Sequence, residues 1–140
     1  MLRNPLIAGK SLNLGINNSN GEFVAFISAH CIPVNNKWLE NLVKTISEKN
    51  NYAGVYGRQQ PMKFSPFIDQ RDLLITFGLD KKIQIKDSFF HNANSIIRRT
   101  VWKKIKFDEK TSNIEDRIWA KKVLKSKKKI LIVTHILSCF

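Results

Sequence analysis

Residues 20–30 read Asn-Gly-Glu-Phe-Val-Ala-Phe-Ile-Ser-Ala-His, and this stretch does most to decide the fold. Its centre, residues 23–27, is a continuous apolar run that follows the turn-forming residues 18–21. Such a run is typical of a strand that is buried on both faces, as in a parallel sheet. Ser28 and His30 would then stand at the carboxyl end of a buried strand, which is where open parallel sheets bind their ligands.

A helix and a second strand are predicted directly after this stretch. Apolar residues recur at helical spacing, and they are Trp38, Leu39, Leu42, Val43 and Ile46. Residues 52–56, Tyr-Ala-Gly-Val-Tyr, predict the next strand. Strand, helix and strand in this order indicate a right-handed βαβ unit, and therefore an α/β fold built in layers.

The remainder of the chain continues this alternation. A helix is expected from Pro66 to Gly78, because proline is tolerated in the first turn of a helix and glycine commonly follows its last turn. A short helix from Thr100 and a longer one from about Asn113 are predicted next. Residues 130–133 predict the last strand.

The chain is strongly basic. Its 140 residues include 24 Lys and Arg against 11 Asp and Glu, which gives a formal charge of +13 and a pI near 10.0. Residues 98–129 alone carry 13 basic and 4 acidic residues. This excess indicates nucleic acid, an acidic membrane face or a phosphorylated ligand as partner, unless it is only a solvated helix face. No zinc-finger spacing, aromatic-basic RNA motif or heptad repeat favours nucleic acid.

The length is that of one domain, and the hydrophobic content of 43% is ordinary for a globular protein. No apolar run is long enough for a membrane span, and the first residues lack the apolar core of a signal peptide. Cys31 and Cys139 are too few for a disulfide framework. We therefore expect a cytoplasmic protein.

Three short segments carry side chains that could do chemistry. The first contains Ser28 and His30, whose imidazole could bind a divalent metal or simply hydrogen-bond the backbone. The second is residues 91–95, His-Asn-Ala-Asn-Ser, whose amides could bind sugar hydroxyls or merely form a turn. The third is the pair Glu115 and Asp116, which would provide a general base or stabilise a helix start.

These segments occur in the order found in family 2 glycosyltransferases, which the chain resembles over roughly residues 4–132. Residues 11–30 resemble the family's Asn-x-Gly helix, its Gly-Glu turn and the buried strand that ends in an Asp-x-Asp type motif. Residues 94–99 resemble its Asn-x-x-x-Arg-Arg segment, and residues 107–116 resemble its Phe-Asp-Glu and Glu-Asp block.

The resemblance implies a partial GT-A fold, which is Rossmann-like, with a mainly parallel sheet and helices on both faces. It also implies transfer of a sugar from a nucleotide-sugar donor to an acceptor hydroxyl, as in polysaccharide or glycolipid biosynthesis. Asp116 would be the base that takes the acceptor proton, and Glu115 would support it. His30 would hold Mg²⁺ or Mn²⁺ at the last position of the metal motif.

Six residues are expected to contact the donor or the acceptor on the same grounds, namely Asn13, Ser28, Asn92, Asn94, Arg98 and Arg99. Ser28 stands where the family has the first Asp of its metal motif, so we expect weak metal binding. The acceptor would be a saccharide or a lipid-linked sugar. The basic residues 98–129 would contact the inner face of the membrane from the cytoplasm.

The family's opening part, which binds the nucleotide base, has no counterpart at the start of the chain. We therefore expect residues 1–140 to form a single incomplete glycosyltransferase-like domain that is inactive on its own. Two alternatives stay open. One is a basic nucleic-acid-binding domain, which only the charge supports, and the other is a non-catalytic remnant of a glycosyltransferase.

Overall fold

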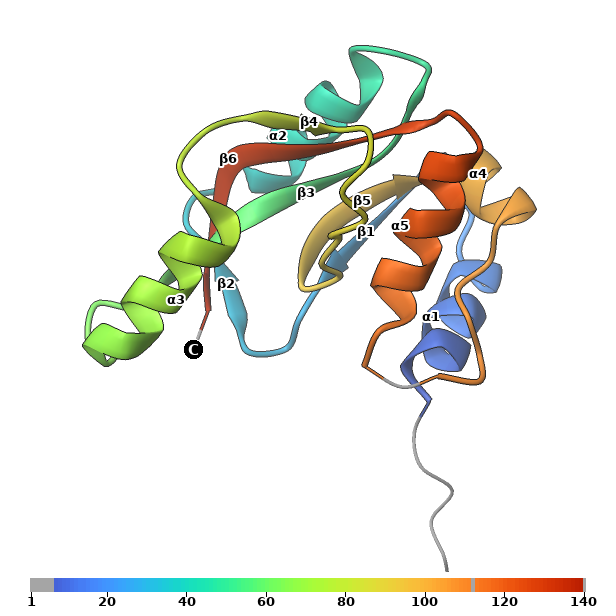
Figure 1. Ribbon diagram of the computed structural model, residues 1–140. Coiled ribbons are helices and arrows are strands. Elements are labelled where there is room, and N and C mark those ends of the chain that lie inside the picture. The colour runs from blue at the N-terminus through green and yellow to red at the C-terminus, as the bar shows by residue number, and fades with distance from the viewer. Residues whose placement is uncertain (1–6, 112, 140) are drawn as a thin grey trace, which may run out of the picture.

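The computed structural model describes residues 7–111 and 113–139, the last nine of them by their backbone (Figure 1). The helices are α1 (Ala8–Asn17), α2 (Trp38–Ser47), α3 (Phe67–Phe77), α4 (Arg99–Lys104) and α5 (Glu115–Lys125). The strands are β1 (Phe23–Ile27), β2 (Cys31–Pro33), β3 (Tyr52–Pro61), β4 (Lys82–Gln84), β5 (Asn94–Arg98) and β6 (Lys129–Cys139). None of the helices in these described ranges is long and apolar enough to cross a membrane.

The strands form one sheet in the order β1-β5-β3-β6-β2, and β4 pairs with β6 outside this path. The expectation of a mainly parallel sheet was wrong, because β3 and β6 are the one parallel pair among the described strands. β5 is antiparallel to both β1 and β3 and lies between them. The predicted βαβ unit is therefore present as two parallel strands that are not neighbours, and the sheet is mixed.

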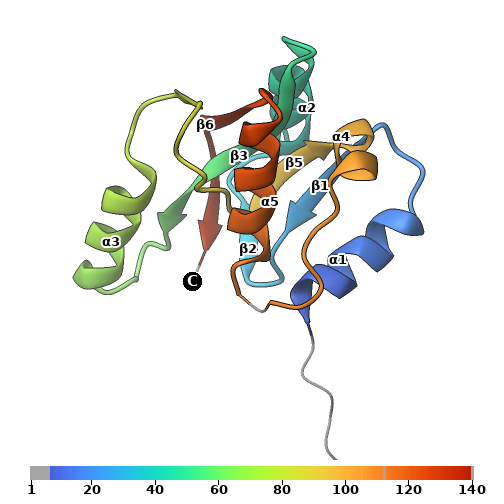
Figure 2. The ribbon, with the colours of Figure 1, turned by 45° about the vertical axis from the view of Figure 1, so that its right-hand side comes forward.

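Helices cover both faces of the sheet, as expected, with α2 on one face and α1, α4 and α5 on the other (Figures 1 and 2). The alternation of side chains along each strand divides the core between the two faces. Val55 and Ile96 pack with α2, whereas Tyr56 and Ile97 pack with the helices of the other face. Trp119 of α5 is fully buried there and stacks against Phe107, with ring centroids 5.5 Å apart.

β1 is less buried than its apolar sequence predicts. It pairs with β5 alone among the described strands, so it is an edge strand, and its Ile27 side chain is 47% exposed. Phe23 and Phe26 are half-buried. The prediction of a strand buried on both faces was therefore wrong for β1, although its bounds match the apolar run.

The directions of the strands define two edges that matter for the site. β1, β3 and β6 run the same way, so they end at one edge of the sheet, here called the carboxyl edge, where β5 begins. At the opposite edge, here called the amino edge, β3 begins and β5 ends. Because α2 leads back to β3 and α5 leads back to β6, both helices begin at the carboxyl edge.

Candidate functional site

The turn after β1 and the segment before β5 are joined at the carboxyl edge. The backbone N–H of Ser28 donates to the carbonyl of Ala93 at 3.0 Å, which continues the ladder between β1 and β5. The carbonyl of Ser28 accepts from the N–H of Cys31 at 2.9 Å and closes a turn around His30. Ser28 is half-buried and His30 is exposed, so the imidazole is accessible at this edge.

Asn94 ties three elements together beneath this turn. Its Oδ1 accepts from the indole Nε1 of Trp38 at 2.8 Å, and its Nδ2 donates to the carbonyl of Arg58 at 3.3 Å. The side chain is almost completely buried. These bonds give Asn94 a structural role, because they fix the start of α2 and the end of β3 against the start of β5.

His91 is held by two donors at one ring nitrogen. The backbone N–H of Ala93 lies 3.2 Å from Nδ1, and the Gln59 amide nitrogen lies 3.0 Å from the same atom. Nδ1 is therefore the acceptor, and the ring proton is on Nε2. Burial lowers the pKa of His91; Asp116 opposes this shift, whereas Arg117 and His30 add to it.

The groups that act on His91 define the candidate site. Asp116 and Arg117 come from the start of α5, and His30 comes from the turn after β1. Each is close enough to His91 to change its pKa. The structure thus brings the predicted base and the predicted metal ligand to the same edge of the sheet, although they are 86 positions apart in the sequence.

The two carboxylates at the start of α5 lie in different surroundings. Asp116 is half-buried, and its Oδ1 accepts from the backbone N–H of Arg117 at 2.7 Å. Glu115 is only 8% exposed and lies against α1. A Cβ atom built onto Gly9 of α1 would be 3.5 Å from the Cβ atom of Glu115. Its Oε2 is buried without a hydrogen-bond partner among the described residues. Asp116 therefore acts electrostatically on His91, whereas Glu115 is part of the packing between α1 and α5.

Asn92 lies beside His91 and differs from Asn94. Both its Oδ1 and its Nδ2 are buried and have no hydrogen-bond partner within the described part of the chain. An unsatisfied amide of this kind costs free energy in the folded state and leaves its hydrogen-bonding capacity to a ligand.

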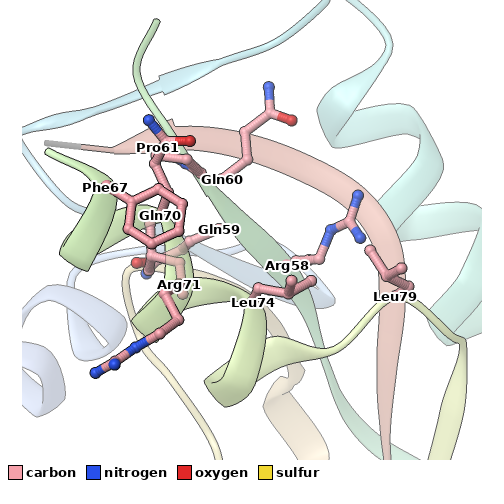
Figure 3. Close-up of a pocket in the computed structure, with 10 residues that line it drawn as sticks. Arg58, Gln59, Gln60, Pro61, Phe67, Gln70, Arg71, Leu74 and Leu79 are labelled. Carbon is pink, nitrogen blue, oxygen red and sulfur yellow. The ribbon is translucent and has the colours of Figure 1, made fainter. Parts of the chain in front are cut away.

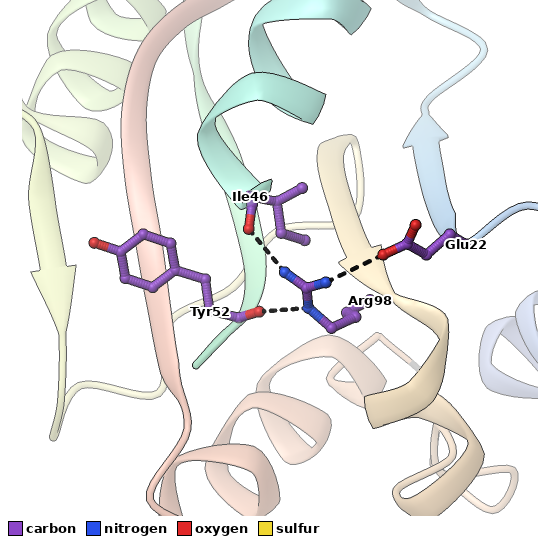
Figure 4. Close-up of polar contacts among 4 residues, drawn as sticks. All are labelled: Glu22, Ile46, Tyr52 and Arg98. Carbon is purple, nitrogen blue, oxygen red and sulfur yellow. Dashed lines mark hydrogen bonds and ion pairs between the residues drawn. The ribbon is translucent and has the colours of Figure 1, made fainter. Parts of the chain in front are cut away.

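The predicted ligand residue Arg98 lies at the amino edge instead (Figure 4). Its guanidinium donates to the carbonyls of Ile46 at 2.9 Å and Tyr52 at 3.3 Å, and it pairs with Glu22 at 3.4 Å. It also lies over the ring of Phe23, 5.0 Å from the centroid. These contacts join the end of α2 to the start of β3, so Arg98 stabilises the fold rather than lining the site.

Arg99 and Asn13 have structural partners as well. The Arg99 guanidinium donates to the carbonyls of Ile16 and Gly21 and to the hydroxyl of Ser19. The Asn13 side chain is 3% exposed, and its Oδ1 accepts from Trp102 Nε1 at 2.8 Å.

The remaining hydrogen bonds of Asn13 occupy all the donor and acceptor positions of its side-chain amide. Its Oδ1 also accepts from the N–H of Phe107 at 3.2 Å, while its Nδ2 donates to the Phe107 carbonyl and to Glu109. The expected contact of Asn13 with donor or acceptor is therefore not what the structure shows, because no hydrogen-bonding capacity is left.

A pocket adjoins the site at the end of β3 (Figure 3). It has a volume of about 380 Å³ and lies between β3 and α3. Phe67, Leu74 and Leu79 supply apolar walls, and Gln59 and Gln70 supply amides. Since Gln59 also contacts His91, the pocket and the His91 cluster share one wall.

The sequence of the chain matches a known family. The family model described as "Glycosyl transferase family 2" matches residues 3–106, well over half of the chain. The chain belongs to this family. No curated protein sequence matches the chain.

Solved structures show the same fold for this family 2 domain. A mannosyltransferase from Pyrobaculum calidifontis, solved with GDP-Man and Mn²⁺, is 16% identical with a TM-score of 0.72, and the match covers 93% of this chain and 35% of that one. TarS 1-349 from S. aureus is 16% identical with a TM-score of 0.68, covering 99% of this chain and 42% of that one. TarS was also solved with UDP, with a TM-score of 0.69. The chain thus spans well under half the length of these glycosyltransferases.

The described residues of this glycosyltransferase-like domain lack the set of ligands expected for a metal from the family resemblance. Within residues 7–111 and 113–130, no group of three or more His, Cys, Asp or Glu side chains could hold a metal ion. Ser28 offers a hydroxyl and His30 a single imidazole, whereas Mg²⁺ and Mn²⁺ prefer carboxylate and other oxygen ligands. The described residues therefore do not form a metal centre.

Sequence reasoning missed three residues of this site, Gln59, Arg117 and Trp38. Gln59 and Arg117 carry no local motif, and their roles depend on pairing between distant segments. His91 belongs to the predicted segment 91–95, but the role of its ring was not predicted. Trp38 was read as a core residue from helical spacing, which does not reveal that its indole binds Asn94. The sequence gives one indication of this role: the indole N–H of Trp38 is a polar group on an otherwise apolar helix face, and such a group usually has a hydrogen-bond partner when buried.

Proposed function

We propose that the chain contributes the acceptor-activating part of a glycosyltransferase that transfers a sugar from a nucleotide-sugar to an acceptor hydroxyl. The observation that carries this proposal is the position of Asp116 at the start of α5 and of His30 in the turn after β1, both at the carboxyl edge and both acting on the pKa of His91. Ligands bind at this edge in open α/β sheets. Membership of family 2 supports the reaction class.

Asp116 is proposed as the general base. Its carboxylate would take the proton of the acceptor hydroxyl while that oxygen attacks the anomeric carbon of the donor sugar. The bond between the anomeric carbon and the diphosphate oxygen breaks in the same displacement, and the diphosphate leaves with the electron pair. Glu115, which is buried against α1, would hold the start of α5 rather than touch the substrate.

The donor is proposed to lie along the turn after β1 and the segment before β5. The Ser28 hydroxyl and the unsatisfied amide of Asn92 would bind its sugar or phosphate oxygens. His30 would supply one side-chain ligand to Mg²⁺ or Mn²⁺, with the donor diphosphate as the main source of oxygen ligands.

The acceptor is proposed to enter the pocket between β3 and α3. A saccharide presents hydroxyls to amides such as Gln59 and Gln70, and its apolar ring face to Leu74. A lipid-linked sugar would use the same pocket and extend along the exposed apolar side chains of α3, which include Phe67 at 80% exposure.

Contact with the inner face of a membrane is proposed at a groove of about 750 Å³ between α4 and α5. Six lysines line it, namely Lys103, Lys104, Lys106, Lys110, Lys122 and Lys125. Polybasic surfaces bind anionic lipid headgroups, and this binding weakens as salt rises. A cytoplasmic location would follow from such a contact.

A segment exchange tests the proposed reaction. Residues 7–139 would replace the matching segment of a complete, active family member, and sugar transfer by the chimera would be measured. We expect D116N to lower turnover by about a hundredfold or more, the usual scale for loss of a general base. The control D69N, an exposed carboxylate on α3 outside the pocket lining, should leave turnover unchanged. Equal turnover for D116N and the unsubstituted chimera would remove Asp116 from the reaction.

A further inference from the structure

The side chain of Arg117 is held on the face of the candidate site. Arg117 is the third residue of α5 and is exposed. Its guanidinium lies over the ring of Phe89, 5.1 Å from the centroid. That ring lies beside His91, with centroids 6.3 Å apart, and His91 accepts from the N–H of Ala93. Ala93 in turn binds Ser28, so a continuous series of contacts runs from Arg117 to the turn after β1.

The side-chain N–H groups of Arg117 have no hydrogen-bond partner in the described part of the chain, in contrast to those of the arginines at the amino edge. Arg98 and Arg99 each donate to two backbone carbonyls. Arg117 makes a ring contact but takes part in no side-chain hydrogen bond or ion pair with the described residues. Its N–H groups are therefore available to a ligand.

The chemistry of this edge calls for such a cation. Departure of a nucleoside diphosphate leaves negative charge that some positive group must stabilise. Ser28 stands where the family places a metal-binding carboxylate, and the described residues supply no set of three metal ligands. A guanidinium matches phosphate oxygens with two parallel hydrogen bonds, and its charge does not depend on a metal.

We infer that Arg117 is the cation that binds the donor diphosphate, and that donor binding at this edge does not require a divalent metal. This inference rests on the proposed function, since it takes a nucleoside diphosphate as the leaving group. It assigns to α5 two adjacent tasks: Asp116 activates the acceptor, and Arg117 stabilises the group that leaves.

Titration calorimetry of the 140-residue chain with UDP tests the inference, once in EDTA and once in MnCl₂. We expect UDP to bind in EDTA with an affinity within about twofold of that in MnCl₂. R117Q should weaken binding in both buffers by about tenfold or more, because it removes a charge-assisted pair of hydrogen bonds. R117K should bind UDP more tightly than R117Q does, because lysine keeps the positive charge, but more weakly than the unsubstituted chain, because lysine cannot make two parallel hydrogen bonds.

K121Q is the matched control. Lys121 is exposed, lies one turn further along the same face of α5 and lines no pocket described above, so its loss should leave UDP binding unchanged. Equal melting curves by circular dichroism would show that each variant is folded. If UDP binds only with Mn²⁺, or if R117Q binds as the unsubstituted chain does, the inference is wrong and the proposed function stands. If UDP binds in neither buffer, the inference is wrong, whereas the proposed function is decided separately by the segment exchange.

Discussion

The two edges of the sheet carry similar polar side chains and use them differently. At the amino edge, Arg98 and Arg99 donate to backbone carbonyls, and nearby Asn13 fills both ends of its amide with protein partners. At the carboxyl edge, Asn92 and Arg117 have no such partners in the described part of the chain. The comparison teaches that a motif residue is available to a ligand only where the fold leaves its hydrogen bonds unmade.

The largest effect on stability is expected from N13A. Truncation leaves the buried N–H groups of Trp102 and Phe107 without their acceptor, and each unsatisfied group costs about 1–3 kcal/mol. Urea unfolding should show a loss of about 2–5 kcal/mol. N18A, which truncates an exposed amide on the same segment, is the control and should cost far less. A loss below about 0.5 kcal/mol for N13A, the range of neutral surface changes, would contradict its structural role.

A smaller loss is expected from R98M. The substitution keeps the length of the side chain but removes the bonds to Ile46 and Tyr52 at the amino edge. Hydrogen bonds to charged groups contribute about 1.5–3 kcal/mol, so unfolding in urea should show a loss of that size. R71M removes an exposed arginine whose ion pair with Asp72 is also exposed, and it should change little. Similar losses of stability for the two variants would mean that the hydrogen bonds of Arg98 contribute no more than an exposed ion pair does.

The carboxyl edge should make stability depend on pH through His91. Burial lowers the pKa of His91 in the folded chain, so the unfolded chain binds more protons between that value and the ordinary value of about 6.5. The contribution of His91 to stability is therefore fully present above about pH 6.5 and is lost as the pH falls below it.

Urea unfolding at about pH 7.5 and about pH 5.5 would measure this effect, because the ordinary pKa of histidine, about 6.5, lies between these values. We expect lower stability at the lower pH and a smaller difference in H91Q. Unchanged or increased stability of the unsubstituted chain at the lower pH would contradict the neutral form of His91.

The smallest effect is expected from N92A. The amide of Asn92 has no described partner to lose, and the removal of an unsatisfied buried amide offsets the packing lost on truncation, so stability should change by no more than about 0.5 kcal/mol. The same variant should bind UDP more weakly, because Asn92 is proposed to contact the donor. A large loss of stability would place Asn92 with the structural residues of the amino edge.

Much of the fold could be predicted where the sequence carries a local pattern. The apolar run gave the bounds of β1, and Pro66 and Gly78 flank α3, with Gly78 at a positive φ of 63°. β5 was not predicted, because its place between β1 and β3 depends on long-range pairing and not on a local pattern. The short strands β2 and β4, three residues each, are too brief for periodicity to indicate.

The candidate site was predictable only in part. Asp116, His30 and Ser28 stand out by position in family motifs, and the structure places them at one edge. Arg98 belongs to an equally good motif, yet the motif does not say whether an arginine faces a ligand or a backbone carbonyl. That choice is made by neighbours from distant segments, such as the carbonyl of Ile46, which no local pattern reveals.

The most direct test of the account is a map of where a nucleoside diphosphate binds. UDP would be titrated into the ¹⁵N-labelled chain, and amide chemical shifts would be followed by NMR. The account predicts shifts at residues 28–31, 91–95 and 115–118, with little change at residues 46–52 and 98–99. Shifts confined to the amino edge, or to the lysine-lined groove between α4 and α5, would contradict the assignment of the donor site to the carboxyl edge.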